Sequence, residues 1–202
     1  MGLSWQMTAG TEAMRHSAFW IFETPLGCCG IAWGEALGPN AAWAVTRFQL
    51  PEATAGRMEA RLSLLTGAGK AAEPPSHICE IVQRVDKHLR GDVRDFRDVP
   101  VDLAGAGVFA QQVYEAARQI PAGKTLSYAE LAAVVGQPAA ARAVGRALGA
   151  NPIPLIIPCH RVVGAGGKPG GFSAPGGRAT KARLLVIEGA AVNLCLELGA
   201  GS

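Results

Sequence analysis

An apolar stretch interrupted by three prolines constrains the fold of this chain more than any other segment. Residues 151–162 read Asn-Pro-Ile-Pro-Leu-Ile-Ile-Pro-Cys-His-Arg-Val. Proline lacks a backbone N–H and fixes φ, so this stretch cannot be a helix. It predicts a rigid segment that holds Cys159, the residue after the third proline, at a fixed place on a turn.

The composition is that of a globular protein. The chain has 202 residues, of which 49% are hydrophobic and 17% charged, so it can build a real core. No apolar run approaches the roughly 18 residues that a membrane span needs. The N-terminus also lacks the order of a signal peptide. We therefore expect a cytoplasmic protein with no membrane partner.

The charge is unevenly distributed along the chain. Residues 1–102 carry 10 Lys+Arg against 12 Asp+Glu, a net charge of −2, whereas residues 103–202 carry 9 against 4, a net charge of +5. All four tryptophans lie in the first half. This contrast favours two domains, 1–102 and 103–202.

The five cysteines have no framework spacing, so disulfides are not expected in a reducing compartment. Cys28, Cys29, His77 and Cys79 could be imagined as metal ligands, but their spacing fits the usual ligand pairs poorly. Small buried side chains are the simpler interpretation, and no metal or cofactor is expected.

The first half predicts short strands followed by helices. Strands are expected at 19–23, 29–33 and 43–48, separated by turns at 25–27 and 38–40, and they suggest an antiparallel meander. Helices are expected at 54–65 and 77–89, the second with an apolar face. Residues 1–17 should be a loose leader. His77 and His88 are interpreted as packing or surface residues.

The second half predicts mostly helices. Helices are expected at 108–118, 128–135 and 139–149, and Ser127 with Glu130 forms a capping-box pattern at the start of the second. A turn at 136–138 joins the last two helices, which makes a candidate helix-turn-helix. This signal is weak alone, since most such helix pairs bind no DNA.

The helix at 139–149 has one face that is nearly bare of side chains. Ala141, Gly145 and Leu148 share a stripe, and Arg142 and Arg146 project beside it. Close packing against a neighbouring helix would explain the small residues. The two arginines favour contact with phosphates and bases instead, because charged residues are seldom buried unpaired.

Cys159 and His160 are candidates for nucleophilic chemistry. An unperturbed thiol is mostly protonated at neutral pH, so a cysteine nucleophile needs a base or a positive field nearby. His160 and Arg161 follow it directly, and on a turn these side chains can converge. For an isolated Cys-His pair, a buried cysteine beside a surface histidine would be the better interpretation.

The neighbouring motifs favour the interpretation of Cys159 as a nucleophile. Ser127-Tyr128, Ala141-Arg142-Ala143-Val144-Gly145, Asn151-Pro152, Pro158-Cys159-His160-Arg161-Val162, Lys181 with Leu184-Leu185, and Glu188-Gly189 occur in one order. Over residues 108–190 this chain resembles the O6-alkylguanine-DNA alkyltransferases, also called methylated-DNA–protein-cysteine methyltransferases. The resemblance implies a ribonuclease-H-like first domain and a winged-helix-like second domain containing the helix-turn-helix.

The resemblance also implies a partner, double-stranded DNA carrying O6-alkylguanine, bound from the minor groove by a monomer. The damaged nucleotide must be rotated out of the duplex before its alkyl carbon can be reached. Arg142 matches the residue that takes its place in the stack, and Tyr128 matches one that crowds the adjacent phosphate. The other residues expected at the DNA are Ala141, Ala143, Gly145 and Arg146.

In the implied reaction, Cys159 attacks the alkyl carbon and keeps the group as a thioether. His160, through a bridging water, and Glu188 match the relay that removes the thiol proton. Asn151 matches a residue that braces the turn. The residues that match the base and alkyl pocket are Pro154, Val162, Phe172, Ser173 and Lys181. A rigid turn for Pro154 and a surface charge for Lys181 are the simpler alternatives.

Two departures from the family pattern concern this pocket. The family usually has Gly-Tyr where this chain has Gly171-Phe172, and Ala174-Pro175 are two extra residues in the loop. They leave the lesion preference open, including O4-alkylthymine. With no regenerating motif, one turnover per molecule is expected. A non-catalytic lesion sensor, a helix-turn-helix regulator and, least of all, a cysteine hydrolase remain as alternatives.

Overall fold

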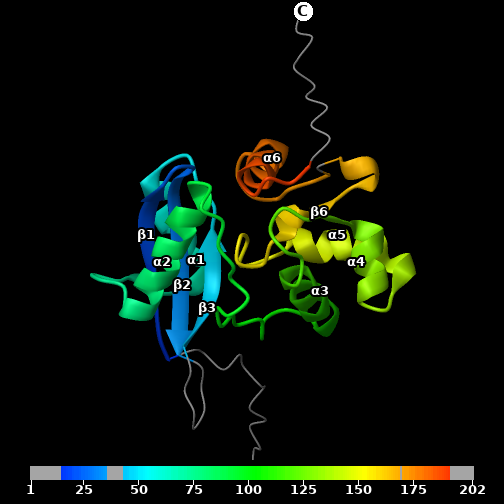
Figure 1. Ribbon diagram of the computed structural model, residues 1–202. Helices are drawn as coiled ribbons and strands as arrows, with labels where there is room; N and C mark the ends of the chain where they lie inside the picture. The colour runs from blue at the N-terminus through cyan, green and yellow to red at the C-terminus, as the bar shows by residue number, and fades with distance from the viewer. Residues whose placement is uncertain (1–14, 36–42, 169, 192–202) are drawn as a thin grey trace, which may run out of the picture.

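The computed structural model describes residues 15–35, 43–168 and 170–191. Figure 1 shows a small sheet with helices α1 and α2 on one side of the molecule and a group of helices, α3 to α5, on the other. Helix α6 lies between these two parts at one end. The architecture is therefore a small mixed sheet with helices, followed by a mainly helical part.

The sheet has four strands in the order β3-β2-β1-β4. Strands β1 (Arg15–Thr24), β2 (Gly27–Glu35) and β3 (Trp43–Gln49) are antiparallel, which confirms the predicted meander. Strand β4 (Gly69–Lys70) was not predicted and pairs parallel to β1. Because β1 begins at residue 15, the expectation of a loose leader is wrong for residues 15–17. Residues 1–14 and the predicted turn at 38–40 lie outside the described residues.

Each face of the sheet has its own apolar cluster. Helix α1 (Ala55–Thr66) covers one face, where Met58 and Leu62 pack on Phe19 and Ala32. A Cβ on Gly30 would lie 2.5 Å from Leu62 Cδ1, so a larger residue here would force the Leu62 side chain to move. The other face contributes to the main core together with helix α2 (Ser76–Leu89). Both predicted helices are confirmed within a residue or so.

The second half follows the predicted helix order. It contains α3 (Val108–Arg118), β5 (Leu126–Ser127), α4 (Tyr128–Val134), η1 (Pro138–Ala140), α5 (Ala141–Gly149), η2 (Cys159–Arg161), β6 (Val162–Val163), η3 (Ala165–Gly167) and α6 (Gly177–Ile187). The capping box at the start of α4 is confirmed, since Ser127 Oγ accepts from Glu130 N and Glu130 Oε2 from Ser127 N. Strand β6 pairs with β5, which brings the segment after Cys159 beside the start of α4.

The start predicted for the helix at 139–149 is wrong by two residues. Pro138 begins a separate 3₁₀ turn, η1, and α5 begins at Ala141. Proline is preorganised for the first position of a turn, so it starts η1 directly after the Gly136-Gln137 break. Arg142 therefore lies in the first turn of α5, at the end nearest the connection to α4.

The two halves share one hydrophobic core. The main cluster runs from Cys29 in β2 to Leu184 in α6. Backbone hydrogen bonds join the halves as well, with Phe48 N in β3 donating to Pro152 O at 3.1 Å. Strand β3 therefore supports one end of the proline-rich segment, which lies between the sheet and the helices.

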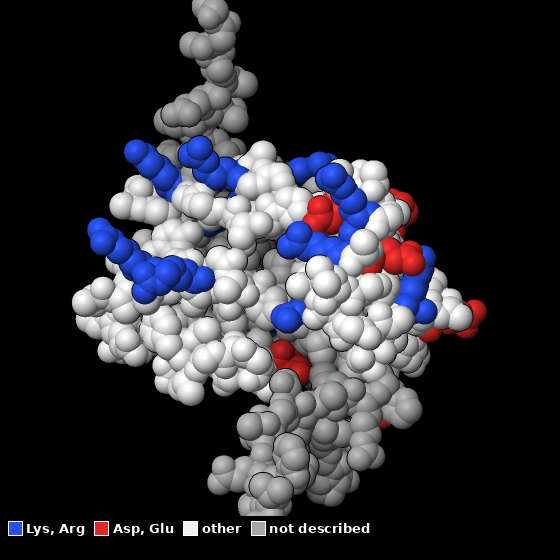
Figure 2. All heavy atoms as spheres, turned by 180° about the vertical axis from the view of Figure 1, so that it is seen from behind, with Lys and Arg blue, Asp and Glu red and all other residues white. Residues whose placement is uncertain are grey.

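The surface charge follows the division seen in the sequence. Figure 2 views the molecule from behind, and on the side of the C-terminal half every coloured atom belongs to Lys or Arg. The Asp and Glu atoms in this view lie toward the N-terminal half and the lower middle. Among the described residues, no helix is both long enough and apolar enough to cross a membrane.

Candidate active site

Asn151 braces the proline-rich segment from inside. Its Nδ2 donates to Ile157 O at 2.9 Å, and its Oδ1 accepts from Ile153 N at 3.0 Å. Ile157 N also donates to Ile153 O at 2.8 Å, and Leu155 between them has a φ of +75°. Such a backbone is strained for a leucine and persists only where its surroundings fix it. The segment therefore holds Cys159 rigidly at the start of η2.

Cys159 is a buried thiol with only 6% of its surface exposed. Burial raises the pKa of the Cys159 thiol, while a hydrogen bond from the Asn151 side chain and the charge of Lys181 act in the opposite direction. A buried cysteine remains a poor nucleophile unless a base takes its proton. The geometry around Cys159 supplies candidates for that base.

His160 and Glu188 form a buried pair behind the cysteine. His160 Nε2 lies 3.0 Å from Glu188 Oε1, and neither side chain is exposed. Burial lowers the pKa of His160 against the opposing effect of Glu188, so the imidazole is neutral near pH 7. Its other nitrogen, Nδ1, has no hydrogen-bond partner in the described part of the chain. A neutral imidazole with a free nitrogen can accept a proton.

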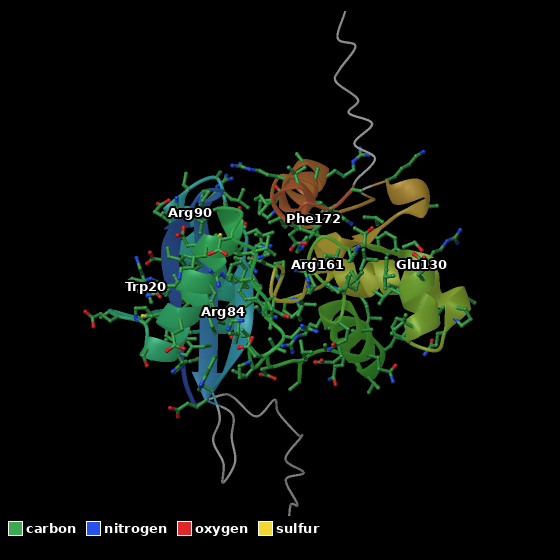
Figure 3. All side chains as sticks on the ribbon, viewed as in Figure 1. Trp20, Arg84, Arg90, Glu130, Arg161 and Phe172 are labelled. Atoms are coloured by element: carbon green, nitrogen blue, oxygen red, sulfur yellow. The ribbon has the colours of Figure 1, made fainter. Side chains whose placement is uncertain are left out.

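Glu188 binds more partners than sequence reasoning assigned to it. Arg161 donates from Nε to Oε2 at 3.0 Å and from Nη2 to Oε1 at 2.8 Å, and His88 Nε2 lies 3.1 Å from Oε1. Burial alone would raise the pKa of Glu188, but the contacts with His160, His88 and Arg161 hold it well below its ordinary range. The carboxylate therefore stays charged. Figure 3 shows Arg161 between the two halves of the molecule.

His88 is the functional candidate that sequence reasoning missed. It was interpreted as a packing residue, yet helix α2 carries it to the carboxylate that also binds His160. One signal was available, because His88 continues the buried stripe formed by Ile78, Ile81 and Val85. A polar side chain on an apolar face must find a polar partner inside the protein.

Lys181 is fully buried, so the alternative of a surface charge is wrong. Its Nζ donates to Val162 O, lies 3.4 Å from the Tyr128 hydroxyl and sits 5.5 Å from the centre of the Tyr128 ring. Burial lowers the pKa of Lys181 to about 8. Lys181 thus links the start of α4 to the strand that follows Cys159.

The shifted pKa of Lys181 gives a testable pH dependence for the chemistry of Cys159. Below pH 8 the ammonium favours the thiolate, and above pH 8 this help is lost because Lys181 becomes neutral. We expect Lys181→Met to react with an alkyl donor about tenfold more slowly at pH 7. The ratio between wild type and variant should approach one above pH 9. A ratio that is constant from pH 6 to 9.5 would contradict this role.

Two cavities meet at Cys159. One of about 480 Å³ is lined by Tyr128, Gly145, Leu148, Gly149, Cys159, Gly171, Phe172 and Ser173. The other, of about 290 Å³, is lined from the second half by Asn151, Pro154, Cys159, Phe172 and their neighbours, and from the first half by Arg47, Gln49, Leu50, Arg61 and Leu65. The first cavity opens beside α5, whereas the second reaches toward the sheet. The structure thus brings Tyr128, Phe172 and Ser173 to the thiol as lining residues.

Helix α5 borders the first cavity. Arg142 and Arg146 are exposed, whereas Ala141 and Ala143 are half-buried. A Cβ on Gly145 would lie 3.8 Å from the Tyr128 ring, so the bare part of the helix faces this tyrosine. Leu148 is buried and belongs to the core, which narrows the predicted stripe to Ala141 and Gly145.

The cysteines of the first half do not form a cluster with His77. Cys28 Sγ donates to Glu23 Oε1, Cys79 Sγ donates to Pro74 O, and His77 stacks on Trp43 at 4.1 Å. In the ranges that the structure describes, no group of three or more His, Cys, Asp or Glu side chains could hold a metal ion.

Comparison with known proteins assigns the family. Residues 108–190 match the family model for the DNA-binding domain of 6-O-methylguanine DNA methyltransferase. A methylated-DNA–protein-cysteine methyltransferase of Mycolicibacterium paratuberculosis is 42% identical over 116 residues, which are 57% of this chain and 68% of that protein. The chain belongs to the 6-O-methylguanine DNA methyltransferase family.

Solved structures of this methyltransferase family extend the likeness to the first half. The crystal structure of Mycobacterium tuberculosis O6-methylguanine methyltransferase has a TM-score of 0.67 and 33% identity, covering 86% of this chain and 93% of that one. The M. tuberculosis OGT in complex with DNA has a TM-score of 0.64 and 32% identity, covering 85% and 92%. The mixed sheet of the first half is therefore part of the shared methyltransferase architecture.

Proposed function

We propose that this protein repairs DNA by transferring the alkyl group from the O6 of guanine to Cys159. The observation that carries this proposal is a rigidly held thiol where two cavities meet, with the His160–Glu188 pair behind it. A hydrolase would need donors aimed at an oxyanion, whereas displacement at an alkyl carbon needs only a thiolate and a leaving group that accepts a proton.

In this reaction the S–C bond forms as the C–O6 bond breaks. The thiol proton passes through a bridging water to Nδ1 of His160, and Glu188 stabilises the imidazolium that results. Tyr128, whose hydroxyl lies 3.4 Å from Lys181 Nζ, can give the leaving guanine its proton. A thioether is not readily reversed, so each molecule reacts once and needs no cofactor.

The guanine would occupy the larger cavity, beside α5. There the backbone carbonyl of Cys159 would accept from the guanine amine and the Ser173 N–H would donate to O6, with Phe172 as an aromatic wall. Val162, the second acceptor that the resemblance implies, lines neither of these two cavities, and its carbonyl accepts from Lys181 Nζ. The smaller cavity would take the alkyl group against Pro154. Phe172 and Ser173 line both cavities, so the loop with the two extra residues, Ala174 and Pro175, would influence which alkyl groups fit.

The DNA partner would be double-stranded and bound from the minor groove by a monomer. Helix α5 borders the larger cavity through Gly145 and carries exposed Arg142 and Arg146. Its small residues, Ala141, Ala143 and Gly145, would permit a close approach to the groove. Arg142 would fill the place of the rotated nucleotide, because a planar guanidinium can stack and donate hydrogen bonds at once. In this proposal, residues 103–202 form a winged-helix-like domain that binds DNA in the cytoplasm. Residues 1–102 form a ribonuclease-H-like support.

The role of Arg142 has a direct test. Arg142→Ala should slow transfer from a duplex containing O6-methylguanine about 10- to 100-fold, because base rotation then loses a stacking partner. The reaction with free O6-benzylguanine should change little, since a free base needs no rotation. A matched control is Arg90→Ala, at an exposed arginine of the N-terminal half, far from α5 (Figure 3). Equal losses with duplex and free base would contradict the assignment.

A further inference from the structure

The carboxylate of Glu188 is shared by two histidines from opposite halves of the protein. His160 Nε2 lies 3.0 Å from Oε1 and His88 Nε2 lies 3.1 Å from the same oxygen, with no exposure of any of the three side chains. Arg161 Nη2 also donates to Oε1 at 2.8 Å. The transfer mechanism uses His160 and Glu188 but assigns nothing to His88, although burying a second imidazole here needs a reason.

Both ring nitrogens of His88 have polar neighbours. His88 Nδ1 lies 3.1 Å from Arg94 N and 3.2 Å from Arg94 O, whereas Nε2 lies 3.1 Å from Glu188 Oε1. Nε2 makes no hydrogen bond within the described part of the chain, so its contact with Oε1 is one of close approach. His88 therefore holds Nε2 at contact distance from the carboxylate, inside the protein.

The ring of His88 is also held in place mechanically. Phe96 meets it edge to face at 5.4 Å. The loop that carries Phe96 and Arg94 is fastened by Arg118 of α3, whose Nη2 donates to the carbonyls of Phe96, Arg97 and Val99. A side chain that only filled space would need neither polar contacts at both ring nitrogens nor a clamped loop. The arrangement therefore orients Nε2 of His88 toward Glu188.

We propose that His88 is a positioning residue of the transfer reaction, which orients the Glu188 carboxylate and moderates its hold on His160. This inference rests on the proposed function. His88 offsets part of the negative charge on Glu188 Oε1. The imidazole of His160 then stays neutral more readily, and its Nδ1 remains free to accept the thiol proton. The N-terminal half thereby contributes to the chemistry as well as to the support of the fold.

The effect on pH follows from the charged groups at this carboxylate. Glu188 faces His88 from the end of α6, His160 and Arg161 face the same carboxylate from η2, and Arg118 reaches the adjoining loop from α3. Among these groups, His160 is the proton acceptor of the proposed reaction, and the charges around it set its pKa. Without His88, the carboxylate of Glu188 acts more strongly on His160, and the pKa of the imidazole rises. The acid side of the rate profile should then move to higher pH.

The test compares His88→Phe, which keeps a ring without a donor, with His88→Gln, whose amide can replace the Nε2–H. The rate of transfer from an O6-methylguanine duplex is measured from pH 5 to 9, together with lesion binding and the unfolding midpoint. We expect His88→Phe to react about tenfold more slowly at pH 6, with its acid limb at higher pH, and His88→Gln to recover most of the rate. His77→Phe, at a histidine at the start of the same helix, should match the wild type.

A second readout does not depend on activity. Titration of the His160 imidazole by NMR should give a higher pKa in His88→Phe than in the wild-type protein. Identical pH profiles and identical His160 titrations in both proteins would overturn the proposal, even if His88→Phe were less stable. Absence of transfer by the wild-type protein would instead refute the proposed function, and the NMR titration would still decide whether His88 acts on His160.

Discussion

Replacing Cys159 by alanine is expected to lower the rate of alkyl transfer by at least about 10³-fold, because no other group can form the thioether. Binding of lesion-containing duplex should persist, since the exposed arginines of α5 and the larger cavity remain. Cys159 is a small side chain in a segment fixed by Asn151, so the variant should also fold. Transfer is measured as loss of O6-methylguanine from the duplex, and binding as an electrophoretic shift.

A matched control separates this effect from a general loss of a cysteine. Cys79→Ala removes a half-buried thiol in α2 that donates only to Pro74 O, and it should leave transfer unchanged. Residual transfer by Cys159→Ala above a few per cent of the wild-type rate would mean that another residue accepts the alkyl group. Loss of both binding and transfer would point to a structural role for the cysteine.

Replacing Glu188 by glutamine should have the largest effect on stability. Among the described residues it removes the one carboxylate that pairs with buried Arg161, and it also breaks the contacts to His160 and His88. Breaking a buried pair on one side typically costs about 3–5 kcal/mol, because the remaining charge is left uncompensated. Transfer should fall too, since the imidazolium of His160 loses its stabilising charge. Denaturant unfolding at pH 7 measures the loss of stability, and transfer assays on the folded fraction measure the loss of activity.

The difference in stability between the wild type and Glu188→Gln should depend on pH with a defined sign. The pKa of Glu188 is lowered in the folded protein, so its charge contributes stability above the unfolded value of about 4.3 and this contribution is lost as the pH falls below it. The stability gap between the wild type and Glu188→Gln should therefore shrink on acidification. The control is Glu130→Gln, which should leave the stability at pH 7 close to that of the wild type, because glutamine also serves in the capping box at the start of α4. A gap that is constant from pH 7 to 3 would contradict the assignment.

Local signals were the ones that sequence reasoning used well. The capping box of Ser127 and Glu130 lies within four residues, and the structure confirms it. Pro158 and its preceding prolines predicted the rigid turn that Asn151 is seen to brace. The family resemblance then singled out His160 and Glu188, which the structure places 3.0 Å apart although 28 residues separate them.

Sequence reasoning missed contacts between distant segments of the chain. Strand β4 is only two residues long, and its pairing with β1 depends on how α1 returns across the sheet. His88 meets Glu188 across the interface of the two halves, and no pattern within α2 indicates which partner it finds. The boundary of α5 depended on whether Pro138 continues the helix or starts a turn of its own.

The most direct test follows a single alkyl group from DNA to protein. A duplex containing O6-methylguanine with a labelled methyl group is mixed with the wild-type protein in varying ratios, and the label is located by peptide mapping. We predict that the label accumulates on Cys159 up to one equivalent per protein molecule and that unmodified guanine is restored in the DNA. Label that is released over many turnovers, that appears on another residue, or that stays on the DNA would contradict the proposed transfer.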